Sequence, residues 1–121
     1  MKTLALLLPL AGLLVAQERP GNFDIRFEPT AKLQTGVEIP FQISVKDALG
    51  KPLTNAKVTL QIETPEHEHT QVFKAPATDP GVYLAKPVFP EPGEWSVYVE
   101  VRRNDQMTAR TIEFNVPQSA P

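Results

Sequence analysis

The sequence predicts an all-β protein, an antiparallel β-sandwich of about seven short strands. Between Trp95 and Val101 every second residue is apolar, and a period of two is typical of a strand that buries one face. The 13 prolines among 121 residues leave little room for a long helix. Turn signals such as Asp79-Pro80-Gly81 recur at a spacing of roughly 8–12 residues, as they do in sandwiches of the immunoglobulin type.

Seven segments carry strand patterns, and strands are expected at 23–28, 37–45, 58–62, 71–75, 82–88, 95–103 and 108–116. The longest clean alternation runs from Val37 to Val45, interrupted on its polar side by Pro40. Proline cannot donate to a ladder, so Pro40 is expected at an edge, a bulge or the unpaired start of the strand. The inward residues of these strands should share one core, with Trp95 largely buried.

The first residues predict a secretory signal peptide at 1–16, because Lys2 precedes a Leu/Ala run that ends at the small residue Ala16. The run is too short to cross a bilayer comfortably, and an uncleaved anchor is the alternative. We expect a flexible lead-in at 17–22, one domain at 23–116 and a disordered tail at 117–121. The lack of cysteine suits a small periplasmic or secreted domain without disulfides and, after cleavage, without a membrane span.

Charge and motif content exclude several classes of function. With 12 basic and 14 acidic residues, the chain does not have the charge of a protein that binds nucleic acid or an anionic membrane. It has no Gly-x-Ser-x-Gly motif, no phosphate loop and no metalloprotease helix motif. Ser44 and Ser96 lie on the outward parity of their strands, so no nucleophile and base can be assembled, and we expect no enzyme activity.

The segment Pro65-Glu66-His67-Glu68-His69 is the one constellation with plausible chemistry. In an extended segment His67 and His69 would project from the same side and could share a metal ion, with Glu66, Glu68 or Glu63 completing the coordination. Imidazole and carboxylate suit Cu(II) or Zn(II). The alternatives are two exposed histidines in a polar loop, or a pH-sensitive loop.

The turns around the fifth and sixth predicted strands have a mechanical interpretation. Gly81 and Gly93 supply conformations that other residues resist. Tyr83 is expected to cover the end of the sandwich and to place its hydroxyl on a backbone carbonyl, as corner tyrosines do in such folds. Arg102, Arg103 and Arg110 lie near the last hairpin, either as exposed charge that discourages edge pairing or as a docking patch for an acidic partner.

Several motifs together resemble the YtkA-like domain family and, more distantly, the FixH-like periplasmic domains. The resemblance covers roughly residues 23–116 and rests on Gly50-Lys51-Pro52-Leu53, Val58-Thr59-Leu60, the His67-x-His69 connection, Gly81-x-Tyr83 and Pro92-Gly93-x-Trp95-x-Val97-x-Val99. It implies a small exported sandwich without established catalysis, often linked to copper or to the assembly of respiratory oxidases. Family members often carry Met beside His in that connection. Here Glu66 and Glu68 stand instead, and the absence of soft ligands disfavours Cu(I).

Two hypotheses follow. The first is an exported, non-catalytic domain that handles Cu(II), with Zn(II) as the weaker choice, through His67, His69, Glu66 and Glu68. The second is a metal-free immunoglobulin-like module that binds an unknown periplasmic or extracellular protein through a sheet face or edge.

Overall fold

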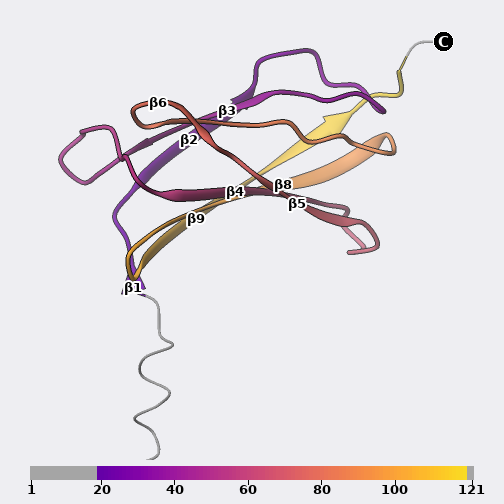
Figure 1. Ribbon diagram of the computed structural model, residues 1–121. Helices are drawn as coiled ribbons and strands as arrows, with labels where there is room; N and C mark the ends of the chain where they lie inside the picture. The colour runs from indigo at the N-terminus through magenta and orange to yellow at the C-terminus, as the bar shows by residue number, and fades with distance from the viewer. Residues whose placement is uncertain (1–18, 120–121) are drawn as a thin grey trace, which may run out of the picture.

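The computed structural model describes residues 19–119, which contain strands and connections but no helix. The strands form two layers (Figure 1). The five-stranded sheet has the order β1-β9-β8-β4-β5 and consists of Arg19–Pro20, Gln106–Val116, Gly93–Arg103, Lys57–Glu63 and Thr70–Lys74. The four-stranded sheet has the order β2-β3-β7-β6 and consists of Asp24–Pro29, Phe41–Lys46, Val82–Ala85 and Ala77–Asp79.

The strand order is that of an immunoglobulin-like sandwich. The sheet β2-β3-β7-β6 corresponds to the A-B-E-D sheet of that fold, and β9-β8-β4-β5 corresponds to G-F-C with one added edge strand. Among residues 19–119, every pairing between two of these strands is antiparallel except that of β1 with β9. The predicted fold class is therefore confirmed.

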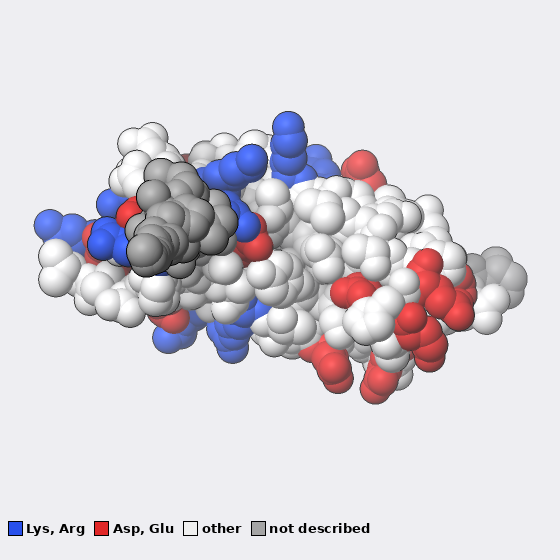
Figure 2. Space-filling model, turned by 90° about the horizontal axis from the view of Figure 1, so that it is seen from below, with Lys and Arg blue, Asp and Glu red and all other residues white. Residues whose placement is uncertain are grey.

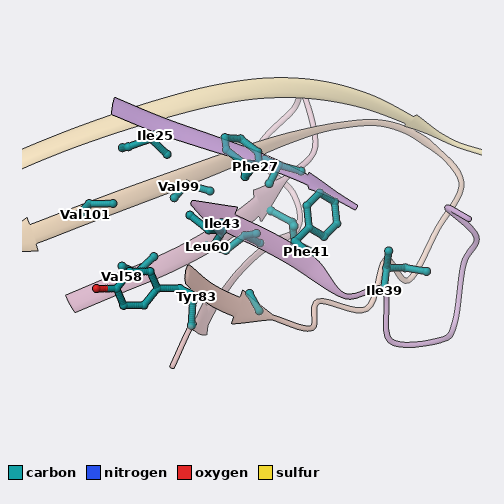
Figure 3. Packing of buried hydrophobic residues seen from close by; sticks show 14 of the residues in the cluster. Ile25, Phe27, Ile39, Phe41, Ile43, Val58, Leu60, Tyr83, Val99 and Val101 are labelled. Carbon is teal, nitrogen blue, oxygen red and sulfur yellow. The ribbon is translucent and has the colours of Figure 1, made fainter. Parts of the chain in front are cut away.

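The core lies between the two sheets and is wholly apolar among the described residues. Figure 3 shows side chains from both layers pointing into this shared interior. Trp95 is 1% exposed, and Val97, Val99 and Val101 are fully buried, as the alternation on β8 predicts. The ring of Trp95 meets that of Phe89 edge to face, with the centroids 5.6 Å apart.

Tyr83 closes one end of the sandwich as predicted. Its side chain is 2% exposed, and its hydroxyl donates a 2.7 Å hydrogen bond to the carbonyl oxygen of Leu53. This bond ties β7 to the connection between β3 and β4, so the buried hydroxyl has a partner.

The segment from Val37 to Val45 differs from the prediction of one continuous strand. Strand β3 begins only at Phe41, directly after Pro40, which therefore precedes the ladder. Val37 is 43% exposed, whereas Ile39 is buried and donates its N–H to the carbonyl of Pro87 at 2.9 Å. Strand β7 likewise ends at Ala85 rather than at Val88, because Pro87 has no N–H to donate.

Two short strands and one contact lie where the sequence predicted irregular chain. Within the expected lead-in, Arg19–Pro20 forms β1, which runs parallel to the start of β9. Ala77–Asp79 forms β6, next to the expected turn. In the expected tail, the hydroxyl of Ser119 donates to the carbonyl of Thr35 at 2.7 Å. β1 and the Ser119 contact depend on distant segments, and β6 pairs with the adjacent β7 through an irregular register; local periodicity records none of these.

The predicted signal peptide at 1–16, with 17, 18, 120 and 121, lies outside the described residues. Within residues 19–119 no helix is long and apolar enough to cross a membrane.

Candidate metal and binding site at the histidine-bearing end

The connection between β4 and β5 is a compact turn and not an extended segment. The hydroxyl of Thr64 accepts hydrogen bonds from the backbone N–H groups of Glu68 and His69, at 3.2 and 3.3 Å. His67 donates its N–H to the carbonyl of Thr64 at 2.9 Å and has a φ of 62°. The assumption that residues 67 and 69 project from one side of an extended chain is therefore wrong, because Thr64 organises a turn there.

His67 faces the carboxylate of Glu63, the last residue of β4. Its Nδ1 contacts Glu63 Oε2, while Glu63 Oε1 accepts a 3.3 Å hydrogen bond from the amide of Gln61. The imidazole is 75% exposed and the carboxylate 22% exposed. The backbone turn places the imidazole over the end of β4, where Glu63 is held by the ladder.

His69 faces a different carboxylate, on the connection between β7 and β8. Its Nε2 lies 2.6 Å from Glu91 Oε2, and its ring centroid lies 6.4 Å from that of Trp95. The indole N–H of Trp95 in turn donates to the backbone carbonyl of Glu91 at 2.9 Å. Glu91 therefore joins the histidine turn to the buried tryptophan.

The site consists of two separate histidine–carboxylate pairs, Glu63 with His67 and His69 with Glu91. Glu66 and Glu68, the carboxylates predicted to complete the coordination, are exposed, and no contact joins their side chains to either imidazole. Within residues 19–119 no group of three or more His, Cys, Asp or Glu side chains is arranged to hold a metal ion. Each pair alone offers one nitrogen and one oxygen donor.

This end of the molecule is strongly acidic. Glu66, Glu68 and Glu91 are exposed on the two neighbouring connections, and Glu94 is exposed at the start of β8. Figure 2 shows most of the acidic side chains in that view at one end, with Lys and Arg over the other half. A concentration of carboxylates attracts cations and basic partners and repels anions.

Comparison with known proteins identifies the family. The model of a family described as YtkA-like matches residues 16–100. The chain belongs to the YtkA-like family. No curated protein matches it. The resemblance drawn from the turn and strand motifs is thereby confirmed.

Two solved structures are similar to this YtkA-like domain. One is a DUF4785 family protein from Legionella pneumophila, with 13% identity and a TM-score of 0.55 over 80% of this chain. The YtkA-like domain spans only 29% of that protein's length, and the similarity concerns the fold alone. The other is the PKD domain of the human receptor SorCS2, with 12% identity and a TM-score of 0.45, covering 100% of this chain and 87% of that one.

The arginines near the last hairpin of the YtkA-like domain make contacts within the domain. Arg102 contacts the carboxylate of Glu100, and Arg103 donates to the carbonyl of Thr54 at 3.4 Å. Arg110 donates to the carbonyl of Ile25 at 2.7 Å, from β9 across to β2. These contacts favour the structural interpretation of the three arginines over a docking patch.

Glu91 was not predicted as a site residue, although its sequence surroundings indicate an exposed connection. Glu91 lies in Pro90-Glu91-Pro92, four residues before Trp95, on a connection that the prolines keep out of the ladder. Nothing local, however, relates Glu91 to His69, because the two are brought together only when β4 and β8 pair.

Proposed function

We propose that the protein is an exported, non-catalytic binding module whose histidine-bearing end takes up a divalent transition-metal ion, Cu(II) in preference to Zn(II). The observation that carries the proposal is the pairing of both histidines with carboxylates, Glu63–His67 and His69–Glu91, at one acidic end of the sandwich. Export rests on the signal-peptide pattern at 1–16, which predicts a periplasmic or secreted location.

The donor set agrees with this choice of metal. Imidazole nitrogen and carboxylate oxygen suit Cu(II) and Zn(II), and the general order of divalent metals places Cu(II) above Zn(II). The chain's two methionines are Met1 and Met107, and Met107 lies on β9 directly after the β8–β9 turn, away from the histidine turn. Among residues 19–119, soft thioether donors for Cu(I) are therefore lacking beside His67 and His69.

The expected binding is modest and leaves room for further ligands. A single histidine–carboxylate pair fills two positions, whereas closed metal sites have four protein ligands. Because the side chains are exposed, water or a partner protein would supply the remaining donors. Such an open pair suits transient handling of a metal ion better than permanent storage.

The position of Trp95 allows metal binding at the His69–Glu91 pair to be tested directly. This is the only tryptophan in the chain, and its ring centroid lies 6.4 Å from that of His69. Cu(II) bound at the His69–Glu91 pair should therefore quench the tryptophan fluorescence in a saturable way. Protons compete with the metal for imidazole nitrogen, so the quenching should weaken in mildly acidic buffer.

The variants His69→Ala and His67→Ala form a matched pair for this titration. His69→Ala should lose most of the saturable quenching, whereas His67→Ala should keep it, because His67 contacts Glu63 and not the tryptophan. The double variant should also show a lower stoichiometry by calorimetry. Equal quenching in the wild type and the double variant would place any metal elsewhere.

A metal-free protein-binding module is the second candidate. It is favoured by the fact that each imidazole already has a carboxylate partner, which satisfies the side chain without an ion. Absence of saturable Cu(II) binding in wild type and variants alike would select this candidate.

A further inference from the structure

The sandwich protects three of its four sheet edges. β6 has three residues between Pro76 and Pro80, with a register shift between Ala77 and Asp79. β2 carries alternating charges and ends in Pro29, and β1 covers the start of β9. Beyond β1, Arg110 places a charge on the outer edge of β9 and donates to the carbonyl of Ile25 on β2. Short strands, prolines, bulges and charges are the usual means of preventing edge-to-edge pairing.

Strand β5 has none of these protections. Thr70–Lys74 contains no proline, pairs with β4 without a register shift, and carries one charged residue, Lys74, at its end. Val72, in its centre, is 59% exposed and is one of three exposed large hydrophobic side chains among the described residues. The strand is the last in the five-stranded sheet (Figure 1).

The free hydrogen-bonding groups of β5 can be assigned from its pairing with β4. The N–H of Ala75 donates to the carbonyl of Val58, so residues 71, 73 and 75 point their backbone groups toward β4. By alternation, Thr70, Val72 and Lys74 direct their N–H and C=O groups outward from the sheet. Thr70 and Lys74 lie two residues to either side of Val72, so the outward groups are arranged symmetrically about Val72.

We propose that β5 is the docking site for a second copy of this chain, which pairs with it as β5 against β5 in antiparallel orientation about Val72. In this register Val72 lies opposite Val72 of the second copy, and Thr70 lies opposite Lys74. Each of the three pairs exchanges two backbone hydrogen bonds, about six in all. The two five-stranded sheets become one continuous sheet across the contact.

Charge complementarity supports a second copy as the occupant. The two-fold axis places the acidic, histidine-bearing end of one copy beside the basic end of the other. Lys74 then lies next to Thr70 of the second copy, whose β4 neighbour is Glu63. No carboxylate among residues 19–119 pairs with Lys74 or with Lys57, so both lysines are free to face the acidic partner.

The symmetry also closes the assembly. An antiparallel contact of an edge with its own copy uses both free edges at once, so it yields a dimer and not a fibre. An edge-to-edge contact through one short strand buries little area, which places the dimer among weak, concentration-dependent complexes. The contact is made through the backbone of β5 and uses neither imidazole.

Single-cysteine variants test the register without background, because the chain contains no cysteine. In the exported protein, Val72→Cys should form a disulfide-linked dimer on mild oxidation, since opposed residues lie within disulfide reach. The matched control Thr70→Cys, on the same face of the same strand, should not. Its counterpart in the second copy lies four residues along, roughly 14 Å away.

Sedimentation equilibrium tests the contact in the absence of cross-links. Val72→Pro removes an outward N–H and leaves the β4 ladder intact, so it should weaken dimerisation roughly tenfold or more. Val72→Thr keeps that N–H and should dimerise about as the wild type does. A wild type that is monomeric at all concentrations, or equal cross-linking of the two cysteine variants, would overturn the proposal. In the first case, an extended segment of another protein would be the remaining occupant to test.

Discussion

Among the described glycines, Gly81 has the least space for an added side chain. It follows Pro80 in the turn before β7, with a φ of 76°, and its carbonyl accepts the N–H of Val45 at 2.9 Å. A Cβ added there would lie 2.6 Å from Pro52 Cβ, 3.0 Å from Pro52 Cα and 3.1 Å from the carbonyl oxygen of Val45. The nearest atoms belong to a rigid proline ring and to backbone, which cannot move aside without disturbing β3.

Gly50 provides the matched control. It has a φ of 83°, close to that of Gly81, but a Cβ added there would meet nothing within 4 Å. Alanine at either position bears the cost of the left-handed conformation, roughly 1–2 kcal/mol. At Gly81 the clash with Pro52 adds an overpacking cost of about 1–3 kcal/mol. Gly50→Ala should therefore destabilise by about 1–2 kcal/mol and Gly81→Ala by about 2–5 kcal/mol.

The difference can be measured by urea unfolding followed through Trp95 fluorescence. The buried indole should report the loss of the core, and the two variants should share one denaturant slope, because they expose the same surface on unfolding. Gly81→Ala should have a clearly lower midpoint than Gly50→Ala. Equal midpoints would show that the turn relaxes away from Pro52 at no cost, contrary to the contact geometry.

Two further predictions concern the core and the pH dependence. Trp95→Ala should destabilise by about 3–5 kcal/mol, the usual range for a buried large aromatic, as measured by thermal unfolding with circular dichroism; a small change would mean that Trp95 is peripheral to the core. The Asp47 carboxylate accepts hydrogen bonds from the N–H groups of Lys51 and Leu49, and the bond from Lys51 is the largest cause of a pKa below the usual 3.8. The lowered pKa means that the ionised carboxylate stabilises the fold at pH values above 3.8 and that this stabilisation is lost as the pH falls through the folded-state pKa. Asp47→Asn should therefore be less stable than the wild type at neutral pH, with the gap closing as the pH falls through the folded-state pKa of Asp47; a gap independent of pH would contradict the assignment.

The parts of the fold that the sequence predicts are those set by local alternation. Trp95 to Val101 alternate with polar residues, and the structure buries all four apolar members. Tyr83 could also be placed, because a tyrosine after a turn glycine in a sandwich has few ways to satisfy its hydroxyl. Val37 was misplaced because alternation continues through Pro40, whereas pairing does not.

The site could be predicted only in part, because its partners come from different strands. The two histidines are evident in the sequence, and Glu63 was among the carboxylates considered. The carboxylate of Glu91 reaches His69 only because β4 and β8 are hydrogen-bonded neighbours, which brings the connection after β4 beside the one before β8. The left-handed φ of His67 could not be predicted from an alternating pattern either. It accompanies a turn in which the hydroxyl of Thr64 accepts hydrogen bonds from the N–H groups of Glu68 and His69.

The core constrains some parts of the sandwich more strongly than others. Burial fixes the inward residues of each strand, so substitutions there are constrained by the core. The exposed residues of the β4–β5 connection and the outward residues of β5 bear no such constraint, yet they hold paired imidazoles and an edge without protection. Strand β5 has no proline, no bulge and no central charge, whereas the other edges of the fold are protected. Packing of the core does not require this difference. Binding of a second copy at β5 supplies the physical reason for it, and that contact is made through Val72, which does not touch either histidine–carboxylate pair.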